Sequence, residues 1–204
     1  YSFLPKCAQR IHETVPQAKL VWILRDPVKR TVSNYKHARK KGRDLRSLRK
    51  AVRSEIAGME TDIFRCYIKR SLYIEQIKRF LKFYSIENMH FILFEEMVNN
   101  PVQVLNGVAG FLGVNPVNSV NRLHKNPTEM PLSPHAMRLC KFLFGTDSKF
   151  YRRFNRLNFK LGNVAARMKP TPINGKIERQ LRMFFLPYNK ELSSLIGLNL
   201  DIWS

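Results

Sequence analysis

The sequence predicts an α/β fold in which a parallel sheet is flanked by helices. Residues 19–24 and 90–94 are short runs of apolar, strand-forming residues, and the continuous apolar run at 19–24 fits a strand that is covered on both faces. Segments with the apolar spacing of helices separate the two runs. A helix start follows the first run directly, and this strand–turn–helix unit is where open α/β sheets bind ligands.

The N-terminal half is predicted to contain four helices around the first strand. One starts near Pro5. The next starts after the strand, because Asp26 is a favourable N-cap and Pro27 suits the first helical position. A further helix covers about 45–56. A longer one covers 62–84, where the apolar residues form a single stripe.

The C-terminal half is predicted to be mainly helical after the second strand, 90–94. A helix starts at Pro101 and ends at Gly113, a residue type suited to a helix C-terminus. An irregular loop is expected over 115–134, and the helical pattern that follows is interrupted at 168–172. Two strands make too small a sheet to be stable alone, so further strands are expected.

Length and composition limit the possible classes of protein. The 204 residues are 44% apolar and include 14 Phe, which is enough for one domain over 1–204 with a hydrophobic core. No apolar run approaches the ~18 residues that span a bilayer. The three cysteines and five histidines lack zinc spacing, so we expect no disulfide framework and no metal site, and the cysteines are predicted to be buried thiols.

Positive charge is concentrated in two segments. The formal net charge is +21; residues 29–53 hold eleven Lys and Arg against one acid, and residues 138–182 hold twelve against two acids. Such a segregated charge attracts polyanions, although it can also be a solvated surface. No RNP aromatic pattern, GXXG loop or zinc finger indicates nucleic-acid binding. On charge alone, a phosphorylated ligand with an anionic polymer acceptor fits as well as nucleic acid.

The most specific segment is 24–35, with the sequence LRDPVKRTVSNY. Arg25 follows the predicted strand, and its planar guanidinium can bind a phosphate through two parallel hydrogen bonds. Ser33 lies seven residues after Asp26, two helical turns along the same face, so its hydroxyl can meet the same phosphate. The spacing fits a second interpretation equally well, in which Arg25 pairs with a local carboxylate and Ser33 is simply packed.

This segment resembles the 3′-phosphate-binding segment of the sulfotransferases that use 3′-phosphoadenosine-5′-phosphosulfate (PAPS) as sulfuryl donor. Further blocks are similar to the same family, in the same order: 73–80 (YIEQIKRF), 90–97 (HFILFEEM), 101–113 (ending in FLG), 181–189 (LRMFFLPYN) and 195–203 (LIGLNLDIW). Because these blocks cover most of the chain, it is identified as a member of this family. The absence of a C-terminal GxxGxxK-type segment favours the carbohydrate-type or bacterial branch.

The resemblance implies a P-loop-like sulfotransferase fold and four donor-binding residues. Arg25 and Ser33 would hold the 3′-phosphate of PAPS or of adenosine 3′,5′-bisphosphate. Arg167 and Lys169 would belong to a late basic loop that closes over the nucleotide phosphates. The implied reaction is sulfuryl transfer to a hydroxyl or amine and needs no metal. The two basic segments favour an anionic glycan as acceptor.

Two parts of the family pattern have no match in this sequence. One is the Ser/Thr/Gly-rich loop, with its strand, that holds the 5′-phosphosulfate; no glycine occurs before Gly42. The other is the catalytic base, because His12 lies on a predicted helix and too close to Arg25. We therefore expect the chain to be the C-terminal two-thirds of the domain, with the first strand, the phosphosulfate loop and the base upstream of Tyr1. Alone, it is expected to be inactive.

Two other interpretations stay open from the sequence. One is a basic module that binds nucleic acid or another polyanion without chemistry. The other is a catalytically inactive sulfotransferase fragment. The family resemblance favours binding of PAPS and a glycan over binding of nucleic acid, and no membrane segment is present. The compartment is open: the cytoplasm for a bacterial protein, or the Golgi lumen if an anchor precedes the chain.

Overall fold

The structure is a computed structural model that describes residues 2–120, 131–168 and 175–203, without the side chains of 163–168. Cys66 and Cys140 are buried as expected, whereas Cys7 is only half-buried, and all three are free thiols. Among the described residues, no helix is long and apolar enough to cross a membrane.

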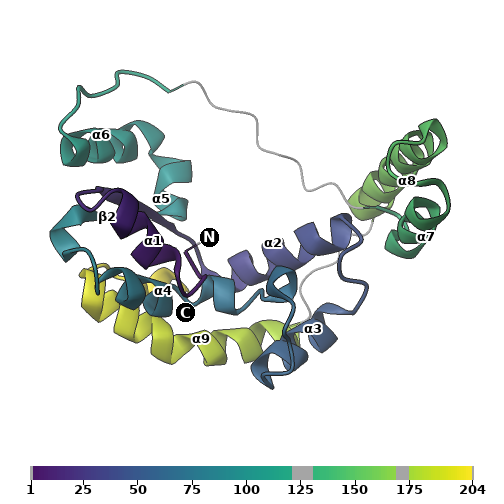
Figure 1. Ribbon diagram of the computed structural model, residues 1–204, viewed down its shortest axis with the longest axis horizontal. Helices are drawn as coiled ribbons and strands as arrows, with labels where there is room; N and C mark the ends of the chain where they lie inside the picture. Colours follow the sequence, from purple (N-terminus) through teal and green to yellow (C-terminus); the bar gives the residue numbers. More distant parts are fainter. Residues whose placement is uncertain (1, 121–130, 169–174, 204) are drawn as a thin grey trace. The chain divides into compact units, whose positions relative to one another are not determined.

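The chain divides into two compact units, each built from segments that are distant in the sequence (Figure 1). Unit 1 comprises Tyr1–Lys29, Lys69–His124 and Arg182–Ser204. Unit 2 comprises Arg30–Ile68 and Lys125–Leu181.

The sheet of unit 1 consists of two parallel strands, which confirms both predicted strands to within one residue. β1 (Leu20–Leu24) pairs with β2 (Met89–Leu93), from Leu20 opposite Met89 to Leu24 opposite Leu93. The further strands expected from the sequence are not among the described residues. Because the strands are parallel, their carboxyl ends lie at the same edge of the sheet.

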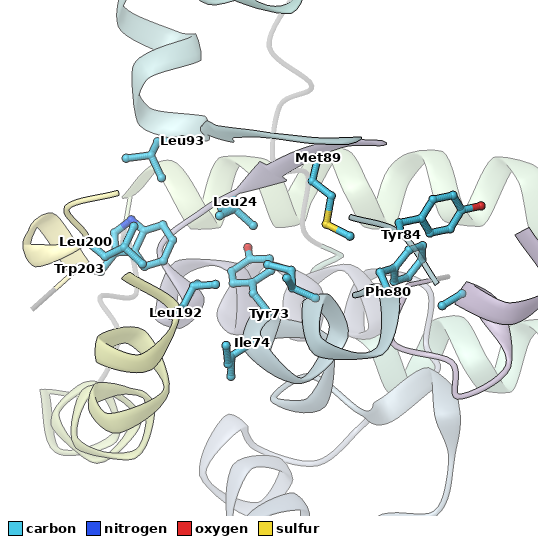
Figure 2. Close-up of a cluster of buried hydrophobic side chains, with 12 residues drawn as sticks. Leu24, Tyr73, Ile74, Phe80, Tyr84, Met89, Leu93, Leu192, Leu200 and Trp203 are labelled. Carbon is cyan, nitrogen blue, oxygen red and sulfur yellow. The ribbon is translucent and has the colours of Figure 1, made fainter. Parts of the chain in front are cut away.

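The core of unit 1 lies on one face of this sheet (Figure 2). It contains Leu24 of β1, side chains of α1 (Cys7–Thr14) and α4 (Tyr73–Phe80), and Leu192 and Trp203 near the C-terminus. Val21 and Ile23 of β1 alternate to the opposite face, where they are 40% and 51% exposed. The expectation that this strand is covered on both faces is therefore wrong, because the helices that bury it lie on one side.

The helix that follows β1 begins where the sequence predicted. It is α2 (Pro27–Lys40), and Pro27 is its first residue. The Oδ1 atom of Asp26 accepts hydrogen bonds from the backbone N–H groups of Val28 at 2.8 Å and Lys29 at 3.2 Å. Two donors that a helix start leaves without an intrahelical partner are thereby satisfied, so Asp26 is the N-cap.

The predicted helix over 62–84 is wrong in its first half. The structure has two 3-10 turns, η1 (Ile63–Arg65) and η2 (Lys69–Ser71), before α4 begins at Tyr73. The carboxylate of Glu55 accepts the backbone N–H groups of Tyr67 and Ile68, at 2.7 Å and 2.9 Å. The N–H of Tyr67 also donates to the C=O of Arg65, two residues earlier, at 3.1 Å. Neither of these partners belongs to the i→i−4 pattern of an α-helix, so the helical pattern is not continued here.

The remaining elements follow the predicted order with some differences at their ends. Helix α3 (Leu48–Ile56) begins after Ser47, whose hydroxyl accepts the N–H of Lys50. Helix α6 (Pro101–Leu112) ends at Gly113, which has a φ of 77° as a left-handed C-terminal residue requires. The other elements are η3 (Ile86–Asn88), α5 (Phe94–Asn99), α7 (Pro134–Phe144), α8 (Lys149–Met168), α9 (Gly175–Ile196) and η4 (Asp201–Trp203).

Unit 2 has a small apolar core beside a buried network of charged groups. Tyr35, the last residue of the 24–35 segment, packs edge-to-face on Tyr67, with ring centroids 5.8 Å apart. The Asp44 carboxylate accepts from the Tyr67 hydroxyl at 2.9 Å and from the Arg46 guanidinium at 2.7 Å. Arg46 also pairs with Glu60 at 2.6 Å. Asp44 is 1% exposed and Glu60 8%, so the two carboxylates of this network are buried.

Candidate functional site

The candidate site lies in unit 1, at the edge where β1 and β2 end. Arg25 and Asp26 follow β1, and Phe94 and Glu95 follow β2. The Arg25 guanidinium lies over the Phe94 ring, 4.9 Å from its centroid. The backbone N–H of Asp26 donates to Oε1 of Glu95 at 3.3 Å. The turn after β1 is therefore held against the first residues of α5.

Tyr73 of α4 fixes the backbone of Arg25 from the core side. Its hydroxyl accepts the N–H of Arg25 at 2.9 Å and donates to the C=O of Arg25 at 3.0 Å. Tyr73 is itself buried. One hydroxyl thus satisfies both the N–H and the C=O of Arg25, the first residue after β1. These two hydrogen bonds fix the backbone from which the Arg25 side chain extends.

Asp26 is a buried carboxylate with an ordered set of partners. Besides capping α2 through Oδ1, it places Oδ2 3.6 Å from the guanidinium of Arg182 and 3.8 Å from the ammonium of Lys29. Arg182 in turn donates to the C=O of Trp203 at 2.8 Å. The negative charge of Asp26 is therefore matched by cations of its own unit, and its role is to hold the turn.

Arg25 differs from Asp26 because it makes no ion pair with a carboxylate among the described residues. Its Nε is buried and has no hydrogen-bond partner there. Of the two interpretations that the sequence allowed for Arg25, pairing with a local carboxylate is not what the structure has. A half-buried guanidinium that rests on an aromatic ring and has donors to spare is suited to binding an oxyanion.

The other three predicted donor-binding residues lie outside the residues of unit 1 that form this edge. Ser33 is on α2 and belongs to unit 2, where its side chain is exposed rather than packed. Arg167 is the penultimate residue of α8, in a helix rather than in a loop. Lys169 lies outside the described residues. The roles of all three stay predictions from the motif.

The sequence predicted no catalytic base within the chain and rejected His12 for that role. In the structure, the His12 ring contacts aromatic side chains. His12 is on α1, and the centroid of its ring lies 5.6 Å from that of Phe83 and 5.2 Å from that of Tyr84. Within the described part of the chain, no three His, Cys, Asp or Glu side chains are grouped so that they could hold a metal ion.

Sequence reasoning missed three residues that build the edge: Tyr73, Glu95 and Arg182. Glu95 had a signal, because it directly follows the second predicted strand and the ends of parallel strands meet. Tyr73 and Arg182 lie in blocks similar to the family, but no local pattern assigns their hydrogen bonds. These three residues position Arg25 and Asp26 and are assigned no direct contact with a ligand.

Replacing Tyr73 by phenylalanine is expected to lower the free energy of unfolding by about 1–2 kcal/mol. The reason is that the N–H and C=O of Arg25 lose their shared partner at a partly buried position. Urea denaturation followed by circular dichroism measures this. Tyr188→Phe, at a half-buried ring on α9, is the matched control and should be nearly neutral. Equal stabilities for the two variants would mean that the Tyr73 hydroxyl does not hold the turn.

Comparison with known proteins finds a matching family model and several similar proteins. The family model described as the sulfotransferase domain matches residues 9–137, which include both strands and the turn after β1. The chain is 26% identical over 189 residues to heparan sulfate glucosamine 3-O-sulfotransferase 3B1 of Mus musculus, covering 92% of this chain and 44% of that protein. It is 25% identical over 206 residues to heparan sulfate glucosamine 3-O-sulfotransferase 5 of Homo sapiens, covering 98% and 54%.

A solved structure agrees with the fold. The sulfotransferase from Alicyclobacillus acidocaldarius superimposes with a TM-score of 0.68 at 25% sequence identity, covering 100% of this chain and 64% of that one. The chain spans about half the length of the curated relatives that it matches. Since the family model covers more than half of the chain, and the α/β fold with its parallel sheet agrees with that of a solved sulfotransferase, the chain belongs to the sulfotransferase family.

Proposed function

We propose that this protein binds PAPS through the edge formed by the ends of β1 and β2, and that it serves transfer of the sulfuryl group to a hydroxyl or amine of a carbohydrate. The observation that carries the proposal is the state of Arg25. It stands at the carboxyl end of a strand, where α/β folds bind ligands, with its guanidinium on Phe94 and no carboxylate partner in the described chain.

The residues of this edge fit the 3′-phosphate of the donor. Arg25 supplies two parallel N–H donors to the phosphate, a geometry that lysine cannot provide. The face of the Phe94 ring limits the positions of the guanidinium, and the Tyr73 hydroxyl fixes the backbone that carries it. PAPS itself supplies the sulfuryl group. Positioning of the nucleotide is therefore the contribution that these residues make to the rate.

The acceptor is proposed to be an anionic carbohydrate. Residues 29–53 and 138–182 carry nearly all of the excess positive charge, which draws polyanions toward the protein. Two of the relatives are named heparan sulfate glucosamine 3-O-sulfotransferases (3B1 and 5), so their names give heparan sulfate glucosamine as the acceptor of those proteins. Ser33, Arg167 and Lys169 are assigned to the nucleotide phosphates from the motif resemblance alone.

The alternative that the net charge of +21 favours is a basic module that binds polyanions without chemistry. Binding of adenosine 3′,5′-bisphosphate by calorimetry separates the two, because such a module binds DNA with a steep salt dependence and free nucleotide does not displace it. Transfer of labelled sulfate from PAPS to heparan sulfate and to an uncharged oligosaccharide then tests the acceptor. We expect saturable nucleotide binding by residues 1–204, and transfer to heparan sulfate by a protein that also carries the phosphosulfate loop and the catalytic base; no nucleotide binding at any salt concentration would refute the proposal.

Ser33→Ala is expected to weaken binding of adenosine 3′,5′-bisphosphate by about 1 kcal/mol, because the variant removes one neutral donor. Adenosine 5′-phosphate lacks the 3′-phosphate and serves as the control ligand. Its affinity should hardly change if Ser33 contacts that group. Equal losses with both ligands, measured by calorimetry, would show that Ser33 does not contact the 3′-phosphate.

A further inference from the structure

The helices α7 and α8 of unit 2 form a hairpin whose inner face is defined by its contacts. The Asn158 side chain accepts the N–H of Ser133 at 2.9 Å and donates to the C=O of Ser133 at 3.1 Å. The backbone of Asn158 also accepts the N–H of Leu132 at 3.0 Å. On α7, Met137 and Cys140 are buried three residues apart. The start of α7 is therefore tied to the middle of α8.

Both helices of the hairpin carry exposed apolar side chains. On α7, Leu139, Phe142 and Leu143 are 59%, 84% and 59% exposed. On α8, Leu157 and Phe150 are seven residues apart, hence on one side of the helix, and both are more than half exposed. Exposed apolar side chains grouped in this way, rather than scattered singly, mark interaction sites.

The same helices carry positive charge and no negative charge. Residues 134–168 contain eight Lys and Arg, and their single acid, Asp147, lies in the turn between the helices. On α8, cationic side chains recur four, three and four residues apart at Lys149, Arg153, Arg156 and Lys160. At 100° per residue this cationic stripe runs about a quarter-turn from the apolar stripe. An apolar stripe bordered by Lys and Arg is typical of a helix that lies in a membrane interface.

We propose that the α7–α8 hairpin docks this protein onto an anionic lipid surface, with its exposed apolar side chains in the headgroup boundary and its cations on the phosphates. The charge argues for this occupant. A second copy would bring the same cationic stripe against it, and a soluble polyanion would leave the apolar stripe in water. The proposal goes beyond the transferase function and does not rest on it.

The test is co-sedimentation of the protein with vesicles of phosphatidylcholine, with and without phosphatidylglycerol, in the absence of PAPS and acceptor. We expect binding to the anionic vesicles, reduced by salt. The double variant Arg153→Gln/Arg156→Gln should bind about thirtyfold more weakly, since each cation near the surface contributes on the order of one kcal/mol. The double variant Phe142→Ser/Leu143→Ser should lose about tenfold or more.

Met59→Ser is the matched control, because Met59 is 69% exposed in the same unit but lies outside the hairpin. It should bind as the native protein does. Circular dichroism identifies any variant that fails to fold, and Leu157→Ser then replaces it. The proposal is overturned if the apolar variant still binds anionic vesicles fully, since charge alone then accounts for binding. It is also overturned if the native protein does not bind the anionic vesicles. The same holds if ultracentrifugation shows instead that the native protein self-associates and that Phe142→Ser/Leu143→Ser abolishes this self-association.

Discussion

Arg25→Ala is expected to weaken binding of adenosine 3′,5′-bisphosphate by about 2–4 kcal/mol. The variant removes the guanidinium and, with it, a charge-assisted bidentate hydrogen bond to the 3′-phosphate. The effect should be large because the guanidinium is half-buried, on the face of the Phe94 ring, and makes no competing ion pair among the described residues. Titration calorimetry of the native protein and the variant measures the difference directly.

Two further variants separate a specific contact from a general loss of charge. Arg10→Ala removes one positive charge from an exposed position on α1 and should leave the affinity unchanged. Arg25→Lys keeps the charge but loses the planar fork, so its affinity should lie between those of the native protein and Arg25→Ala. If Arg10→Ala and Arg25→Ala weaken binding equally, the nucleotide is attracted by net charge and the site assignment is wrong.

Asp44→Ala is expected to lower the free energy of unfolding by about 3 kcal/mol. Asp44 is 1% exposed and accepts hydrogen bonds from the Tyr67 hydroxyl and from the guanidinium and backbone of Arg46. Removing it leaves these donors without their shared acceptor inside unit 2. Asp147→Ala, at an exposed acid of the same unit, should stay within about 0.5 kcal/mol of the native protein. Urea denaturation of the three proteins gives the comparison.

The contribution of Asp44 should also depend on pH. Burial raises the pKa of Asp44, but the hydrogen bonds from Arg46 and Tyr67 outweigh burial and hold this pKa below its ordinary value. A carboxyl whose pKa is lower in the folded state binds protons more readily when unfolded, so its stabilisation is present above the unfolded value of about 4. It is lost as the pH falls toward the lowered folded pKa. The stability gap to Asp44→Ala should therefore close in acid; a gap that is constant from neutral pH to strong acid would contradict this.

The elements that the sequence predicted well depend on neighbouring residues alone. Asp26 and Pro27 mark the start of α2 because capping and a fixed φ act within one turn, and Gly113 ends α6 for the same kind of reason. The first half of the predicted helix over 62–84 fails where the backbone N–H groups of Tyr67 and Ile68 donate to Glu55, twelve and thirteen residues earlier. No periodicity of apolar residues reports a contact of that kind.

The same division holds for the candidate site. The sequence by itself determined that Arg25 follows a strand and precedes a capped helix, and that the motif carrying it resembles a phosphate-binding segment. Only the tertiary structure decided that Tyr73 holds the Arg25 backbone and that Glu95 accepts from Asp26, across 48 and 69 residues of chain. Local propensity and caps are properties of a few adjacent residues. The partners of a buried polar group, in contrast, are chosen when distant segments pack together and every buried donor must find an acceptor.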